Sequence, residues 1–74
     1  NIMNKYKIQI GGMHCTSCVM LIEGDLEDMN CVVSAHCNYA KGECIVNADA
    51  DLDNNEIEKI ITNDGYSVLN MEEI

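Results

Sequence analysis

Residues 5–18 read KYKIQIGGMHCTSC, and this stretch predicts how the rest of the chain is arranged. In residues 5–10 polar and apolar side chains alternate, which is the pattern of a β-strand with one buried face. Two glycines then end the strand, and a helical pattern begins after Cys15. We therefore expect the thiols of Cys15 and Cys18 at the start of a helix. The buried face of the strand would be formed by Tyr6, Ile8 and Ile10.

The helical pattern after Cys15 predicts one apolar face. Apolar side chains recur at spacings of three and four residues, while acidic side chains occupy the opposite side. We expect Met20 and Leu21 to widen the buried stripe, and Gly24 to mark a close contact with the sheet. The stripe itself consists of Val19, Ile22, Leu26 and Met29.

Two further strand patterns, residues 32–39 and 43–48, flank a turn and predict a β-hairpin. A turn centred between residues 40 and 41 places Cys37 nearly opposite Cys44, and Tyr39 would share the inner face. The acidic segment 49–53 lacks the glycine and the terminal glutamate spacing of an EF-hand calcium loop. We expect it to be a solvated loop.

Asp53 and Glu56 have the spacing of a capping box, which predicts a second helix that ends at Gly65. A last strand is expected over residues 66–71, with residues 72–74 frayed. The element order is then βαββαβ, which is the ferredoxin-like arrangement. The sequence predicts one α+β domain over residues 1–74, a two-layer sandwich whose four-stranded antiparallel sheet carries two helices on one face.

Length and charge exclude several classes of function. The chain has 74 residues, and 13 acids against four lysines give a formal net charge of -9. This charge repels phosphate backbones and anionic lipids, so we expect neither nucleic-acid binding nor direct membrane contact by this domain. A chain of this size also has little room for a large catalytic cleft. We expect no catalytic residues and a binding module rather than an enzyme.

The expected location is the cytoplasm. No apolar run is long enough to span a membrane, and the first residues do not form a secretory signal. Five cysteines cannot all pair within one chain, which favours a reducing compartment. The start at Asn1 rather than at methionine favours a piece of a larger protein, such as the cytosolic domain of a membrane transporter.

Cys15 and Cys18 can support two kinds of chemistry. A thiolate both attacks disulfides and binds metals, and its pKa falls at the N-terminus of a helix. Thiolates are soft donors that prefer Cu(I), Zn and heavier ions, and two sulfurs suit a low-coordinate ion such as Cu(I) better than Zn. A thioredoxin-like redox pair is the first alternative, but the chain is short for that fold and contains no proline. A structural zinc site is the second, and it lacks a second closely spaced pair of ligands.

The motif Gly12-Met13-His14-Cys15-Thr16-Ser17-Cys18, together with the Gly65-Tyr66 pair and the element order, resembles the heavy-metal-associated domain family. That family comprises soluble copper chaperones, N-terminal modules of copper-transporting P-type ATPases and mercury-binding proteins. The resemblance implies that Cys15 and Cys18 bind the metal, that Met13 is a core residue and that Tyr66 lies near the site. Family members that select Zn, Cd or Pb often place an acid beside the cysteines, whereas His14, Thr16 and Ser17 are uncharged. The resemblance therefore points to Cu(I), with Zn, Hg, Cd and Ag as other possible ions.

The chain departs from the family pattern at three cysteines. Cys31 stands where the family usually has glycine, and we expect it to be half-exposed and away from the metal-binding loop. Cys37 and Cys44 replace what are commonly valine and alanine, and we expect them to be small buried side chains rather than a second metal or redox site, although a disulfide could form under oxidation. His14 and His36 are expected to be exposed and without a ligand role.

The resemblance also implies a mechanism and partners. The domain would pass its ion to or from a copper chaperone or another heavy-metal-associated domain by exchange of thiolate ligands. A net charge of -9 favours a partner with a basic docking face, because electrostatic complementarity sets partner choice. We expect an acceptor module of a copper-transporting ATPase, monomeric without metal, with a free-standing chaperone as the alternative.

Overall fold

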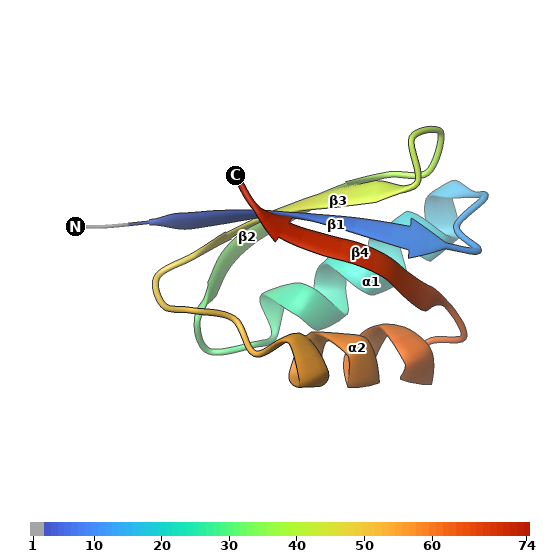
Figure 1. Ribbon diagram of the computed structural model, residues 1–74. Helices are drawn as coiled ribbons and strands as arrows, with labels where there is room; N and C mark the ends of the chain where they lie inside the picture. Colours follow the sequence, from blue (N-terminus) through green and yellow to red (C-terminus); the bar gives the residue numbers. More distant parts are fainter. Residues whose placement is uncertain (1–2) are drawn as a thin grey trace.

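The computed structural model of the protein describes residues 3–74, so the first two residues of the predicted domain lie outside the described part. The chain forms six elements in the expected βαββαβ order (Figure 1). They are β1 (Asn4–Gly11), α1 (Thr16–Glu27), β2 (Val32–Asn38), β3 (Glu43–Ala48), α2 (Asn54–Asn63) and β4 (Ser67–Glu73).

The four strands form one antiparallel sheet in the order β2-β3-β1-β4. Both helices lie on the same side of this sheet, and the other side is open (Figure 1). The predicted ferredoxin-like sandwich is therefore confirmed. Because β1 is a central strand, the loop that follows it begins in the middle of the sheet, at the end where α1 starts.

The core lies between the sheet and the helices, as the apolar periodicity predicts. Alternate residues of β1 face the helices. On α1, the apolar stripe that faces the sheet includes Ile22 and Leu26, which are both fully buried. The α2 stripe contributes Ile57 and Ile61, also fully buried. Asp53 caps α2 by accepting a hydrogen bond from the backbone N–H of Asn55 at 2.9 Å. The inner face of β1 consists of Tyr6, Ile8 and Ile10.

Two expectations for α1 are wrong. Met20 and Leu21 do not widen the buried stripe, because they are 67% and 47% exposed. Each helical residue turns about 100° from the previous one, so side chains directly after Val19 point away from the sheet. Gly24 marks no close contact, because a Cβ atom placed there would meet nothing within 4 Å.

The C-terminal tail and Tyr39 also differ from expectation. The tail is not frayed, since β4 continues to Glu73, which pairs with Tyr6 on β1. The backbone groups of β1 on this side need partners, and the tail supplies them. Tyr39 lies beyond the end of β2 and is 46% exposed, not buried. There the side chain of Asn38 accepts a hydrogen bond from the backbone N–H of Ala40 at 2.9 Å and so begins the turn.

The register of the hairpin is as predicted, and Cys37 lies opposite Cys44. The two residues form a disulfide, with their Cα atoms 3.9 Å apart. The expectation of two independent small side chains is therefore wrong, although Cys44 is fully buried. The backbone N–H of Cys37 points away from β3 towards Glu23, so Cys37 and Cys44 form a non-hydrogen-bonded pair. In such a pair the Cα atoms and side chains are closer than in a hydrogen-bonded pair. This pairing brings the two sulfur atoms together.

Within residues 3–74, no helix has both the length and the apolar character that crossing a membrane requires.

Candidate metal-binding site

The sharp turn in the loop between β1 and α1 requires a glycine at position 12. Gly12 has φ of +101°, in the left-handed region that side chains rarely adopt. A Cβ atom at this position would also lie 3.1 Å from the ring of Tyr66, closer than ordinary van der Waals contact. Gly12 therefore allows the chain to turn sharply beneath the Tyr66 ring and deliver the next residues to the start of α1.

Met13 and His14 occupy the positions expected for them. Met13 is 7% exposed and belongs to the core, so it anchors the loop from below. His14 is exposed, and its Nδ1–H donates a hydrogen bond to the carbonyl oxygen of Gly12 at 2.7 Å. That bond turns the imidazole back along the loop and fixes which ring nitrogen carries the proton.

Cys15 and Cys18 lie next to each other at the start of α1. Cys15 is the N-cap residue with extended backbone angles, and Cys18 lies in the first helical turn. Their Sγ atoms are 2.9 Å apart. Cys15 is half-buried, whereas Cys18 is only 8% exposed. The loop thus presents one accessible thiol and one shielded thiol that contact each other.

The surroundings of Cys18 favour its thiolate. Its pKa is lowered from 9.0 to about 7, first by the hydrogen bond with Cys15, then by one with Tyr66 and by the backbone N–H of His14. Burial opposes the shift, and the positive form of the nearby imidazole adds a small lowering. A substantial fraction of Cys18 is therefore a thiolate at neutral pH, which is the form of cysteine that can ligate soft metals.

Tyr66 completes the site from the other end of the chain. It lies between α2 and β4, against the loop and half-buried. Its pKa is raised to about 12, first by the hydrogen bond to Cys18, then by burial and by the negative charges of the thiolates and Asp64. Its hydroxyl therefore stays protonated and donates to the sulfur. The predicted position of Tyr66 near the thiols is what the structure shows.

Replacing Tyr66 by phenylalanine is expected to raise the pKa of Cys18 from about 7 toward its ordinary value of 9.0. The variant keeps the ring over Gly12 but loses the hydroxyl donor that stabilises the thiolate. Because the thiolate is the reactive form, the rate at which iodoacetamide alkylates Cys18 rises as pH increases through this pKa. The midpoint of the rate profile should move to higher pH in the variant. An unchanged midpoint would show that the tyrosine hydroxyl does not act on Cys18.

The other candidate residues lie away from this pair. Cys31 is a half-buried free thiol between α1 and β2, as expected. His36 is exposed on the open side of the sheet, as expected, while Cys37 and Cys44 are joined to each other. Among residues 3–74, no three side chains of His, Cys, Asp or Glu come together in a way that could hold a metal ion. The structure thus brings together Cys15 and Cys18, with Tyr66 and the backbone of His14 around them.

The sequence did not identify a pair of acids near Tyr66. Asp64 ends α2, and burial raises its pKa to about 6, assisted by the hydrogen bond and negative charge of Asp25 on α1. The Oδ2 atom of Asp64 is shielded from solvent and has no hydrogen-bond partner in the described part of the chain. These two acids are far apart in sequence, and only the packing of α1 against α2 brings them together.

A ferredoxin-like domain with two thiols in contact at the start of a helix has the architecture of a small metal-binding module. Comparison with known sequences agrees with this class. The chain belongs to the heavy-metal-associated domain family, whose sequence model matches residues 7–67. The resemblance that the motif indicates is thereby confirmed.

Individual relatives differ in size and role. The mercuric reductase of Lysinibacillus sphaericus is 31% identical over 72 residues, which cover 97% of this chain but 13% of that enzyme. The copper chaperone CopZ of Bacillus subtilis is 31% identical over 67 residues, which cover 89% of this chain and 97% of the chaperone. The water-soluble region of the P-type ATPase CopA from Bacillus subtilis has a TM-score of 0.79 and 30% identity, over 92% of this chain and 46% of that structure.

Proposed function

We propose that this domain binds one Cu(I) ion between Cys15 and Cys18 and passes it to or from a partner domain by exchange of thiolate ligands. The observation that carries the proposal is the contact of the two Sγ atoms, 2.9 Å apart at the start of α1. Both sulfurs can donate to the same ion, and the lowered pKa of Cys18 supplies a thiolate at neutral pH.

The choice of Cu(I) rests on the donor set. Two thiolates are soft ligands, and they suit an ion that is satisfied with few ligands. The side chains next to the cysteines in the chain are His14, Thr16 and Ser17, none of which adds a carboxylate for a harder ion. The similarity to a copper chaperone and to the soluble region of CopA supports copper, and that to a mercuric reductase keeps Hg among the possible ions. Zn, Cd and Ag are the other candidates.

The different exposure of the two thiols supports transfer by ligand exchange. Cys15 is the more accessible thiol, so a partner thiolate can approach the ion from its side before Cys18 is displaced. Cys18 is held in the first turn of α1 and by Tyr66, and it would release the ion last. No covalent bond of a substrate is formed or broken in this transfer, so the domain acts as a carrier and not as an enzyme.

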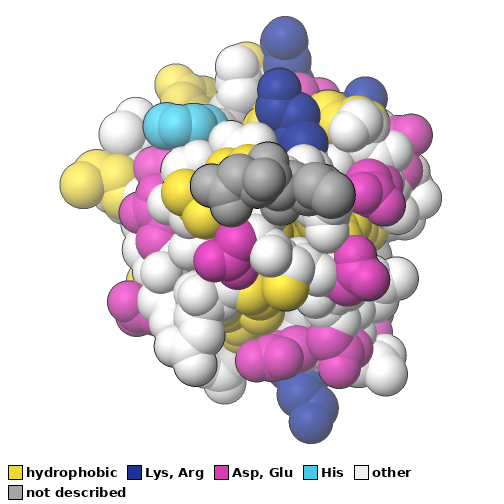
Figure 2. All heavy atoms as spheres, turned by 90° about the vertical axis from the view of Figure 1, so that its left-hand side faces the viewer, with side chains coloured by type: hydrophobic (Ala, Val, Ile, Leu, Met, Phe, Trp, Pro, Cys, Tyr) yellow, Lys and Arg dark blue, Asp and Glu magenta, His cyan; other side chains and the backbone are white. Residues whose placement is uncertain are grey.

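The charge of the domain supports a basic partner. On the end of the molecule where the chain begins, acidic side chains are spread over much of the surface, and lysine side chains lie at its upper and lower edges (Figure 2). With a net charge of -9, the domain would associate fastest with a copper chaperone or another heavy-metal-associated domain that has a basic docking face. We propose a monomeric acceptor module of a copper-transporting P-type ATPase, located in the cytoplasm.

A free-standing copper chaperone is the second candidate, favoured by one specific observation. The chain covers 97% of CopZ, which is itself a chaperone, and the identities to CopZ and to the CopA region are nearly equal, 31% and 30%. The full-length protein separates the two candidates. Transmembrane runs and a phosphorylation-domain motif in the same polypeptide would identify an ATPase, and a chain that ends with this domain would identify a chaperone.

A competition titration tests copper binding. Under anaerobic conditions, Cu(I) is added to the reduced protein in the presence of a strong Cu(I) chelator, and the domain is expected to take one equivalent from it. Failure to compete would contradict the proposal. Two parallel assays address the alternatives. If the cysteines form a structural zinc site, a chelator should unfold the domain and abolish its circular dichroism signal. If the domain is a thiol redox protein, it should reduce insulin.

A further inference from the structure

A second pair of sulfur atoms lies outside the proposed metal site. Cys37 on β2 and Cys44 on β3 form a disulfide between neighbouring strands. The two sides of this bond differ in access, because Cys44 is fully buried and Cys37 is only half-buried. A reagent in solution can therefore approach the bond at Cys37 and not at Cys44.

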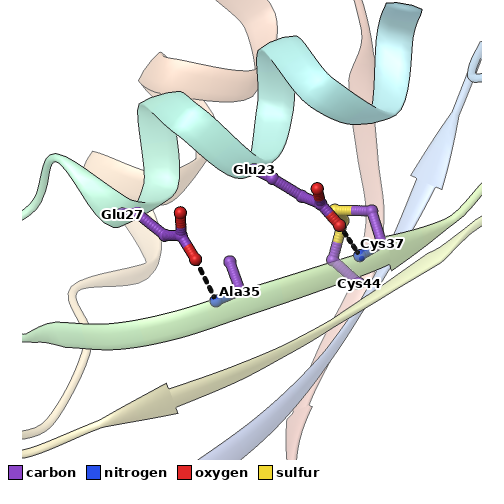
Figure 3. The surroundings of a disulfide bond; sticks show 5 residues. All are labelled: Glu23, Glu27, Ala35, Cys37 and Cys44. Carbon is purple, nitrogen blue, oxygen red and sulfur yellow. Dashed lines mark hydrogen bonds between the residues drawn. A yellow bond between two sulfur atoms is a disulfide. The ribbon is translucent and has the colours of Figure 1, made fainter. Parts of the chain in front are cut away.

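An acid from α1 lies beside this bond. β2 is an edge strand, and two of its backbone N–H groups donate hydrogen bonds to glutamates of α1. The N–H of Cys37 donates to Oε2 of Glu23 at 2.7 Å, and the N–H of Ala35 donates to Oε2 of Glu27 at 3.1 Å. Figure 3 shows the two carboxylates along the same strand, with that of Glu23 at the disulfide and that of Glu27 away from it. Both contacts join a glutamate of α1 to a backbone N–H of β2, but Glu23 is half-buried and lies at the sulfurs, whereas Glu27 is exposed and lies away from them.

The hairpin does not depend on the disulfide to keep its shape. The bond joins residues only seven positions apart, so it removes little entropy from the unfolded chain compared with a bond that closes a long loop. The β2–β3 ladder and the two glutamates already hold β2 in place. In a reducing compartment, disulfides of this kind are usually transient or redox-sensing rather than structural. Opening and closing the bond should therefore leave the fold intact.

We propose that Cys37 and Cys44 form a second, redox-active site that small thiols such as glutathione open and close through Cys37, with Glu23 restraining the exchange. To open it, a glutathione thiolate attacks Sγ of Cys37, the bond between the two cysteines breaks, and Cys44 leaves as a thiolate that takes up a proton. A second glutathione thiolate then attacks the mixed disulfide, releasing the Cys37 thiolate and glutathione disulfide. The protein disulfide is reduced and two glutathiones are oxidised, and the reverse sequence closes the site.

Glu23 restrains this exchange by its charge. The attacking group is an anion, and so is the sulfur that is released at Cys37 in the second step. The carboxylate of Glu23 lies against the backbone of Cys37, so it repels both species. Replacing Glu23 by glutamine keeps an oxygen that can accept the hydrogen bond and removes the negative charge.

The first test uses mixed disulfides. In a background in which Cys15 and Cys18 are serine, reduced Cys44→Ala and Cys37→Ala variants are exposed to glutathione disulfide and analysed by mass spectrometry. Cys37 in the first variant should form the glutathione adduct rapidly, and Cys44 in the second should do so only when the protein unfolds. Equal reaction of both cysteines in folded protein would overturn the proposal. Copper binding is not measured here, so failure of this test leaves the metal-site proposal untouched.

The second test compares matched variants in which Cys15 and Cys18 are serine and the other three cysteines are retained. Glu23→Gln is expected to increase the rate at which glutathione reduces the disulfide by about three- to tenfold, as removal of a nearby unit charge implies. Glu27→Gln removes the same charge at Ala35, away from the sulfurs, and should change the rate less than about twofold. Equal acceleration in both variants would show that a loosened β2 and not the charge of Glu23 is responsible, which contradicts the proposed restraint.

A measurement on the chain with both cysteines present covers the case in which a variant does not fold. Reduced protein is alkylated briefly under native conditions, and the modified peptides are identified by mass spectrometry. Cys37 should be modified before Cys44. Preservation of the disulfide in excess glutathione over many hours, or preferential modification of Cys44, would overturn the proposal.

Discussion

Replacing Cys15 and Cys18 together by alanine is expected to lower Cu(I) affinity by at least on the order of a thousandfold, because removal of a residue that only supports a ligand already costs about 10- to 100-fold. The two sulfurs are the pair that the structure places in contact, 2.9 Å apart. Without them the loop offers no thiolate, and the thioether of Met13 is buried in the core. The affinity is measured by competition with a Cu(I) chelator of known strength.

The control for this prediction is Cys31→Ala. Cys31 is also a free thiol and half-buried, but it lies in the connection between α1 and β2. Its removal should leave the affinity unchanged within about twofold. Circular dichroism should show the native fold in both variants, since Cys15 lies at the margin of the core and the change at Cys18, which is buried in it, removes only one sulfur atom. Full affinity in the double variant would contradict the assignment of the metal site.

Replacing Ile8 by alanine is expected to destabilise the domain by about 3 kcal/mol, within the range of about 2–5 kcal/mol for large-to-small changes in a core. Ile8 is fully buried on the central strand β1, where it lies opposite Cys44 on β3 and Met71 on β4. Its removal leaves a cavity where three strands and the helices meet. A domain of this size has a free energy of unfolding of only about 5–10 kcal/mol, so the substitution removes a large fraction of the total stability. Urea denaturation followed by circular dichroism measures it.

Met20→Ala is the matched control, because it removes a large apolar side chain that is 67% exposed on α1. Its free energy of unfolding should stay within about 0.5 kcal/mol of the original value, as for most surface substitutions. The denaturation should be done at one fixed redox state of the Cys37–Cys44 bond. If Met20→Ala costs as much as Ile8→Ala, the assignment of the core to the inner sheet face is wrong.

The periodic segments of the chain were predicted correctly, because their pattern is local. The alternation in residues 5–10 places Ile8 and Ile10 inside, and the spacing of Ile22 and Leu26 gives the buried face of α1. The capping residue Asp53 was also identified, since its preference for the start of a helix depends only on the next few residues.

The errors concern residues whose environment is set by distant parts of the chain. Nothing local indicates that residues 72 and 73 continue a strand, because their partners are Lys7 and Tyr6 on β1. The exposure of Met20 depends on which side of α1 meets the sheet. In the same way, the carboxyl pair of Asp25 and Asp64 exists only because α1 packs against α2.

The sequence by itself determined the order of the elements and the placement of Cys15 and Cys18 at the start of a helix, since periodicity, capping and the glycine turn act over a few residues. It also indicated the family, through a short motif. Only the tertiary structure decided what surrounds the thiols. The ring and hydroxyl of Tyr66 reach Gly12 and Cys18 because β4 pairs with β1, and the resulting hydrogen bond helps to lower the pKa of Cys18. It likewise decided that Cys37 and Cys44 form a disulfide next to Glu23, since strand register and helix packing are long-range properties of the folded chain.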